Sequence, residues 1–129
     1  MKEPVWINLE DCLAFHDGLL ARFGGLAGVR DEGLLHSALN RPQQLLNYEK
    51  PTLHQIAACY AYGIAKNHPF LDGNKRSALM ACAMFLECNG FVFTASEEDA
   101  ILQTLGLAAS EVSEAEYADW LKANSKKRK

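Results

Sequence analysis

The sequence predicts an all-α fold, a compact bundle of about six helices around a central buried helix. Apolar residues recur at three- and four-residue spacing along almost the whole chain, which is the period of an amphipathic helix. Helix-capping residues precede these runs, and glycine or proline follows several of them. The 129 residues contain no internal repeat or linker, so we expect one domain over residues 1–125 and a disordered basic tail over residues 126–129.

The first two predicted helices lie in the first third of the chain. Asn8 is a good N-cap for the first helix, and Gly24-Gly25 ends it. Asp31 can cap a second, shorter helix. We expect Pro42 to end that helix, because proline has no N–H to donate and its ring clashes with the preceding turn. Residues 43–51 are then predicted to form a loop.

The third and fourth helices flank a short polar loop. Thr52 and Gln55 have capping-box spacing and begin the third helix. This helix should end near His68, because the proline that follows disfavours the helical conformation in the residue before it. A fourth helix is predicted from about Asn74 to Asn89-Gly90, and since it is apolar on almost every side we expect it to be the buried centre of the bundle.

The last two helices follow a short extended link at residues 91–94. Ser96 with Asp99, and Ser113 with Glu116, have the spacing of an N-cap and its partner in the first turn. Each pair precedes an apolar run of helical period. These two helices complete the bundle.

The composition favours a cytoplasmic protein. The first residues contain no signal-peptide apolar stretch, and no apolar run reaches the roughly 18–20 residues that span a bilayer. The four cysteines have no C-x-x-C spacing, and three of them lie in apolar helical patterns. They are therefore interpreted as buried thiols, which suits a reducing compartment.

The distribution of charge argues against nucleic-acid binding. Four of the thirteen basic residues lie at positions 126–129, which leaves nine basic against sixteen acidic side chains in residues 1–125. A body with a net charge of −7 lacks the basic face that such binding needs. We therefore expect no direct nucleic-acid binding, and we interpret the tail as a solvated terminus.

The strongest functional signal is the run His68-Pro69-Phe70-Leu71-Asp72-Gly73-Asn74-Lys75-Arg76. The N-terminus of a helix presents unpaired N–H groups and a partial positive charge, which favour a bound phosphate. Lys75 and Arg76 add two cations in that first turn, where the helix dipole disfavours them unless an anion lies between them. Asp72 can hold a magnesium ion at the phosphates, and His68 can take a proton from an attacking hydroxyl.

Each of these residues alone also has an ordinary structural interpretation. A histidine at a helix end is often a surface or capping residue, Asp-Gly marks a turn, and Phe70 suits a core anchor for the loop. The glycine-rich segment 24–28 with Arg30 is either a helix-to-helix turn or the border of a target-binding face. The remaining histidines are isolated and are interpreted as surface or packing residues: His16, His36 and His54.

The run at 68–76 resembles the signature of the Fic/Doc superfamily, whose Fic branch reads H-P-F-x-[D/E]-G-N-G-R-x-x-R. Two departures from the Fic pattern are shared with the death-on-curing (Doc) branch, because Lys75 replaces a glycine and Leu79 replaces a second arginine. The segment from Gly28 to Leu39 is also similar to an upstream signature of that branch. The resemblance covers essentially the whole chain and implies a Fic/Doc-like helical bundle.

The resemblance implies a protein kinase that uses ATP and Mg²⁺. In Fic enzymes the glycine leaves an anion hole and the second arginine grips another phosphate, so that AMP is transferred. Lys75 would fill that hole and Leu79 cannot bind phosphate, which implies another orientation of ATP, with the γ-phosphate facing His68. The implied acceptor is a threonine hydroxyl of translation elongation factor Tu, whose modification stops protein synthesis.

The resemblance also assigns roles by position. His68 is expected to be the general base and Asp72 the magnesium ligand, and both belong to a catalytic set with Lys75 and Arg76. The residues expected to bind nucleotide or phosphate are Gly73, Asn74, Lys75, Arg76 and, as a further cation, Lys66.

The family further implies a toxin of a type II toxin-antitoxin system. Some Fic proteins inhibit themselves through [S/T]-x-x-x-E-[G/N], but Ala115 breaks that pattern after Ser110 and Glu114. We therefore expect control in trans by a small cognate antitoxin. Two alternatives stay open, namely Fic-type AMP transfer to a protein hydroxyl and a non-catalytic helical binding module that retains the motif.

Overall fold

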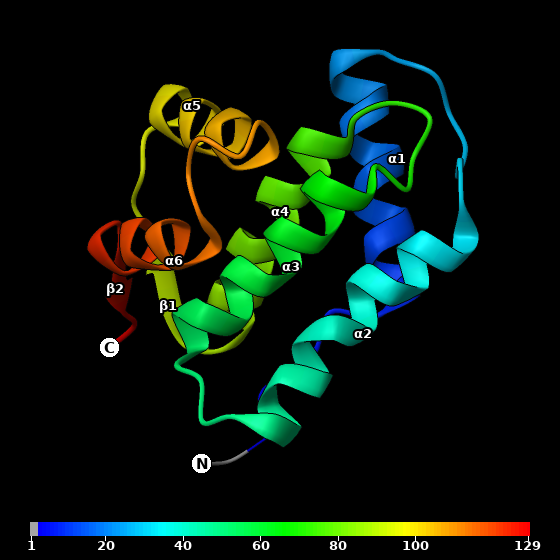
Figure 1. The fold of residues 1–129 in the computed structure, drawn as a ribbon. Helices are drawn as coiled ribbons and strands as arrows, with labels where there is room; N and C mark the ends of the chain where they lie inside the picture. The colour runs from blue at the N-terminus through cyan, green and yellow to red at the C-terminus, as the bar shows by residue number, and fades with distance from the viewer. Residues whose placement is uncertain (1–2) are drawn as a thin grey trace.

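Six helices and a two-stranded sheet make up the computed structural model, which describes residues 3–129 (Figure 1). The prediction of an all-α bundle is confirmed. No helix among the described residues is long and apolar enough to cross a membrane. The elements are α1 Leu9–Phe23, α2 Glu32–Tyr48, α3 Leu53–Asn67, α4 Asn74–Cys88, β1 Phe91–Phe93, α5 Glu97–Ala108, α6 Glu114–Ala123 and β2 Ser125–Lys127.

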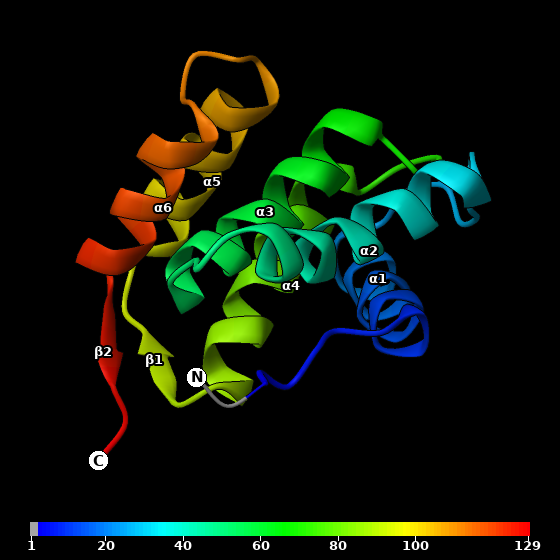
Figure 2. The ribbon, with the colours of Figure 1, turned by 60° about the horizontal axis from the view of Figure 1, so that its bottom comes forward.

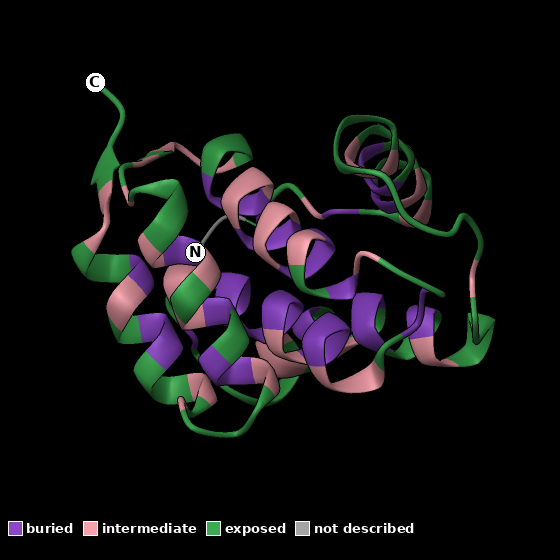
Figure 3. Ribbon diagram, turned by 90° about the horizontal axis from the view of Figure 1, so that it is seen from above, coloured by how far each residue is buried: buried purple, intermediate pink, exposed green. Residues whose placement is uncertain are grey.

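Two helices, α3 and α4, share the centre of the bundle. Nine of the fifteen residues of α3 are buried, against seven of fifteen in α4. α3 packs against α2, α4, α5 and α6, and α4 also packs against α1 (Figures 1 and 3). The expected central buried helix is therefore present, but α3 carries more of the core than α4, whose outer positions such as Leu79 and Met80 are only half-buried.

The predicted N-caps are confirmed at five helices. Asn8, Thr52 and Ser113 form complete capping boxes, and the Asp31 and Ser96 side chains each accept one backbone hydrogen bond in the first turn. Each cap satisfies a backbone N–H that a helix start leaves without a partner. Among the six helices of residues 3–129, only α4 begins without a side-chain cap.

α2 continues through Pro42 to Tyr48, so the prediction that Pro42 ends it was wrong, and the predicted loop over residues 43–51 is confirmed only for residues 49–51. The proline removes one helical hydrogen bond, which would run to the carbonyl of Ala38. This turn is pressed against α3, because a methyl group added at Gly63 would lie 3.1 Å from the Ala38 Cα. Pro42 itself is buried, so packing of α2 on α3 offsets the local cost.

The prediction of a disordered tail was also wrong for Lys126 and Lys127, which belong to β2. β2 pairs antiparallel with β1, with Phe91 opposite Lys127 (Figure 2). The ladder extends beyond β2, where the Arg128 N–H donates to the Gly90 carbonyl at 2.8 Å. The His54 Nε2 also lies 2.8 Å from the Ser125 Oγ, which ties the start of β2 to α3. The backbone hydrogen bonds of β1 are thus satisfied by the tail.

Three of the four cysteines are buried, namely Cys12, Cys59 and Cys82, whereas Cys88 is exposed. Burial raises the pKa of each buried thiol to about 12. These thiols are therefore protonated and inert at neutral pH, as expected for core residues.

Candidate active site

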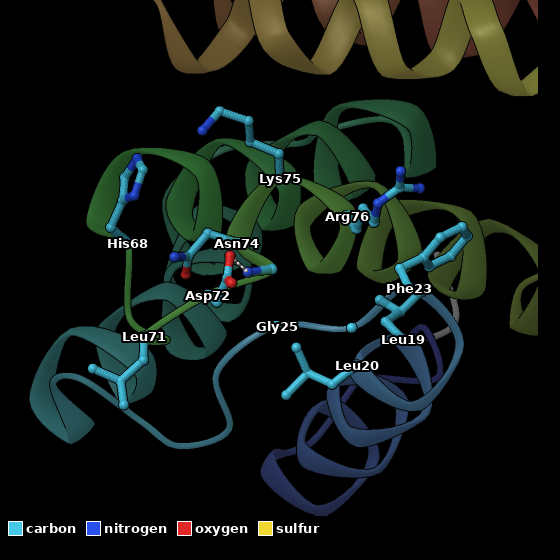
Figure 4. Close-up of a pocket in the computed structure, with 12 residues that line it drawn as sticks. Leu19, Leu20, Phe23, Gly25, His68, Leu71, Asp72, Asn74, Lys75 and Arg76 are labelled. Atoms are coloured by element: carbon cyan, nitrogen blue, oxygen red, sulfur yellow. Dashed lines mark hydrogen bonds between the residues drawn. The ribbon is translucent and has the colours of Figure 1, made fainter.

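A pocket of about 600 Å³ opens between the C-terminal end of α1, the loop that joins α3 to α4, and the first turn of α4 (Figure 4). Leu19, Leu20 and Phe23 of α1 form one wall, and Gly24 and Gly25 follow them. All but one of the site residues predicted from the sequence line the pocket: His68, Asp72, Gly73, Asn74, Lys75 and Arg76.

The uncapped start of α4 forms the floor of this pocket. Gly73 is the N-cap residue with φ 77° and ψ 19°, a left-handed conformation that glycine adopts without steric cost. No side chain bonds to the first N–H groups of α4. Unpaired N–H groups and the positive end of the helix dipole therefore face the pocket together with Lys75 and Arg76, a combination suited to an anion.

Asn74 fixes the shape of the loop before α4. It is 8% exposed; its Oδ1 accepts from the Phe70 N–H at 2.9 Å, and its Nδ2 donates to the Phe70 carbonyl at 2.9 Å. Phe70 is buried, so the interpretation of its side chain as a core anchor is confirmed. Both polar atoms of the Asn74 amide are thus engaged in holding the loop, although the residue lines the pocket as predicted.

His68 ends α3 in a strained backbone conformation. Its φ of 48° and ψ of 56° lie in the left-handed region, which is uncommon for residues other than glycine. Arg30 holds this turn from outside, with its Nε donating to the His68 carbonyl at 2.6 Å and its Nη2 to the Asn67 carbonyl at 2.8 Å. A histidine kept where glycine fits better points to a functional use of the imidazole.

The surroundings of His68 favour a neutral imidazole. Burial, followed by the positive charges of Lys75, Arg30 and Lys66, lowers the pKa of His68 below its usual value of 6.5. A neutral ring at physiological pH can accept a proton, as a general base must. Figure 4 shows His68 and Lys75 pointing the same way, toward α5, with which they enclose a second cavity of about 450 Å³.

Asp72 extends into the pocket from the same loop. Its Oδ1 accepts from the Gly73 N–H at 2.9 Å and its Oδ2 from the Leu26 N–H at 3.3 Å, which fixes the carboxylate. Gly25 must be small here, because an added methyl group would lie 2.8 Å from Asp72 Oδ2. Residues 24–28 therefore contact and support the Asp72 loop, which agrees with their interpretation as a turn.

One carboxylate beside a phosphate cradle is a donor set that suits Mg²⁺. This ion keeps several waters and is bound through one or two carboxylates plus phosphate oxygens, rather than by a cage of side chains. Asp72 is the acidic residue that lines the pocket, and within residues 3–129 no cluster of three or more His, Cys, Asp or Glu side chains is placed to hold a metal. Asp72 and a bound phosphate would therefore hold the ion jointly.

His16 supports the site, although the sequence predicted for it only a surface or packing role. It is 2% exposed, its ring is stacked on Phe70 at 3.7 Å between centroids, and its Nε2 donates to the Asp72 carbonyl at 2.8 Å. The ring therefore joins α1 to the loop that carries Asp72. The apolar face of α1 places His16 toward the interior of the protein. No local sequence pattern indicates its partners, Phe70 and Asp72, because they lie more than fifty residues further along the chain.

The structure does not bring Lys66 into the phosphate pocket. Its ammonium donates to the Ala108 carbonyl at 3.2 Å and to the hydroxyl of Ser110, at the C-terminal end of α5. Cations are favoured there, because the last carbonyls of a helix carry partial negative charge. Lys66 thus links α3 to α5, and its charge reaches the site through its effect on the His68 pKa.

The small helical bundle and the histidine loop before the uncapped start of α4 agree with the Fic/Doc-like fold that the sequence motif implies. A family model described as the Fic/DOC family matches residues 6–86, and the chain belongs to this family, in its Doc branch. It is 38% identical over 117 residues to "Protein kinase doc" of Escherichia phage P1, which covers 90% of this chain and 92% of the relative. It is 43% identical over 87 residues to "Toxin Doc" of Mycolicibacterium smegmatis, covering 66% and 65% of the two chains.

Proposed function

We propose that this protein is a cytoplasmic Doc-type toxin that transfers the γ-phosphate of ATP to a threonine hydroxyl of elongation factor Tu and thereby blocks translation. One observation carries the proposal: a single pocket joins an uncapped helix start, two cations, a carboxylate and a histidine of lowered pKa. That set meets the needs of phosphoryl transfer, which depends on positioning and on charge stabilisation.

The phosphates of ATP are expected to lie on the first turn of α4. The N–H groups after Gly73 and the side chains of Lys75 and Arg76 supply donors and positive charge. Asp72 would hold Mg²⁺, which supplies charge neutralisation at the phosphate oxygens. His16, Asn74 and Arg30 keep the loop in the shape that places these groups.

His68 acts as the general base toward the acceptor. The threonine oxygen attacks the γ-phosphorus while its proton passes to the neutral imidazole. The bond between the γ-phosphorus and the β,γ-bridging oxygen breaks, and ADP leaves. The lowered pKa of His68 keeps the base unprotonated at neutral pH.

The identity of Lys75 and Leu79 favours transfer of phosphate over transfer of AMP. Lys75 occupies the helix position at which a Fic glycine would leave space, and Leu79 lines an apolar cavity where the second Fic arginine would stand. The similarity to a relative named as a protein kinase supports the same choice. AMP transfer and a non-catalytic binding module are the outcomes that the experiment below separates from it.

Control by a cognate antitoxin is part of the proposal. The Doc relatives support a toxin whose partner acts in trans. An apolar cavity of about 260 Å³ between α1, α4 and α5 adjoins the phosphate pocket and shares Leu19, Phe23 and Arg76 with it. A helix of a small partner seated on this cavity would restrict access to the phosphates.

The proposed function is tested by following which phosphate of ATP is transferred to the target protein. Purified protein, Mg²⁺ and elongation factor Tu are incubated with ATP labelled at the γ- or the α-phosphate. We expect label on elongation factor Tu from γ-labelled ATP only, its loss in His68→Ala, and no change in His36→Ala, which alters an exposed histidine of α2. Label from α-labelled ATP would establish AMP transfer, and no label from either with folded protein would favour a binding module.

A further inference from the structure

The Arg76 guanidinium is held by an aromatic ring. Its Cζ lies 3.8 Å from the centroid of the Phe23 ring, well within the range of a cation–π interaction. Figure 4 shows the two side chains next to each other at one end of the pocket. Among residues 3–129, no hydrogen bond or ion pair engages the Arg76 guanidinium, whereas the Phe23 ring lies in contact with it.

Phe23 has a position that core packing does not explain. It is the last residue of α1 and is 41% exposed, whereas the phenylalanines of the core are buried. Both Phe23 and Arg76 line the phosphate pocket and the apolar cavity beside it. The Arg22 guanidinium also lies 4.9 Å from the centroid of the same ring, so two cations contact Phe23.

We propose that Phe23 is a positioning residue for Arg76 and so for the phosphates that Arg76 binds. The π face attracts the guanidinium without using any of its five N–H donors, which stay free for phosphate oxygens. Contact with the ring also restricts a long side chain before the anion arrives, so less rotamer freedom is lost on binding. For ATP this inference rests on the proposed function, whereas for a simple phosphate anion it rests on the geometry alone.

A double-mutant cycle tests the coupling between the two side chains. The affinities of inorganic pyrophosphate and of a non-hydrolysable ATP analogue with Mg²⁺ are measured by calorimetry for the wild type, Phe23→Leu, Arg76→Ala and the double variant. Phe23→Leu keeps an apolar side chain but removes the π face. The ordering of one long side chain on binding corresponds to about a 2- to 10-fold change in affinity, and we expect a loss within that range.

Two further variants separate positioning from a general effect on structure. Phe23→Tyr keeps the ring face and should bind both probes as the wild type does. Phe91→Leu makes the same chemical change at a half-buried phenylalanine of β1, away from the pocket, and should leave both affinities unchanged. Thermal unfolding of every variant checks that the fold is retained.

The cycle also separates this inference from the proposed function. We expect Phe23→Leu to have no further effect once Arg76 is alanine. An equal loss in both backgrounds, or a loss in Phe23→Tyr as large as in Phe23→Leu, would overturn the positioning role even if the protein phosphorylates its target. Coupling measured with pyrophosphate would support that role even if no kinase activity is found, and failure of the wild type to bind pyrophosphate would overturn it.

Discussion

Replacement of His16 separates the two contacts by which this ring supports the candidate active site. The ring is buried, stacked on Phe70 and hydrogen-bonded through Nε2 to the Asp72 carbonyl at 2.8 Å. His16→Ala removes both contacts and leaves a cavity, which should lower the free energy of unfolding by about 3 kcal/mol. His16→Phe keeps a ring for stacking and loses the hydrogen bond, and since water can reach the exposed Asp72, the cost should be only about 1 kcal/mol.

Urea unfolding measures the two losses, with His36→Phe as the control at an exposed helical position, where a change within about 0.5 kcal/mol is expected. The same variants are then assayed for phosphotransfer as a function of Mg²⁺ concentration. If the hydrogen bond places Asp72, His16→Phe should need more Mg²⁺ for half-maximal activity than the wild type, although it is well folded. A Mg²⁺ dependence identical to that of the wild type would refute the role of His16 in placing Asp72. A His16→Phe protein as unstable as His16→Ala would refute the assignment of most of the stability to stacking.

Three further predictions concern the base, the helix start and a distant ion pair. Because the pKa of His68 lies below 6.5, the phosphotransfer rate should fall to half its maximum only below pH 6.5, as the base is protonated. Lys75→Met should raise this pKa in an NMR titration, and a wild-type midpoint above 6.5 would contradict the assigned environment. Gly73→Ala should cost about 1–2 kcal/mol in urea unfolding, because φ is 77°, and an unchanged stability would exclude the left-handed conformation. Arg41→Met breaks the 2.6 Å ion pair with Glu114 and should lower the free energy of unfolding by about 1 kcal/mol. The phosphotransfer rate should not change, and a large decrease in that rate would show that the ion pair contributes to the active site.

The parts of the fold that could be predicted are those set by neighbours in the sequence. A capping residue and its partner are three positions apart, so the starts of α1, α3 and α6 follow from short patterns that the structure confirms. Likewise, Gly73, Lys75 and Arg76 lie within four successive residues, and this short pattern predicts the start of α4 that the structure shows.

The parts that could not be predicted depend on contacts between distant segments. Pro42 stays helical because α2 packs on α3, and the basic tail is ordered because β1 offers a free strand edge. Lys66 was expected among the phosphate ligands, yet the carbonyls at the end of α5 hold its ammonium. In each case the free energy of the local conformational preference is smaller than that of the tertiary contacts, and the sequence does not show which distant segments come into contact.

The residues of the site differ in how they use their polar atoms. His16, Arg30 and Asn74 use their polar atoms on the backbone of the loop, whereas none of the hydrogen bonds in residues 3–129 engages the side chains of Lys75 or Arg76. Two unpaired cations at the positive end of a helix repel each other and the dipole, which destabilises the protein without an anion. Binding of phosphate as proposed would relieve this repulsion in the folded state only, so the anion should stabilise the fold in proportion to the logarithm of its concentration. The same charges that weaken the free protein would then supply the affinity for phosphate that the proposed function requires.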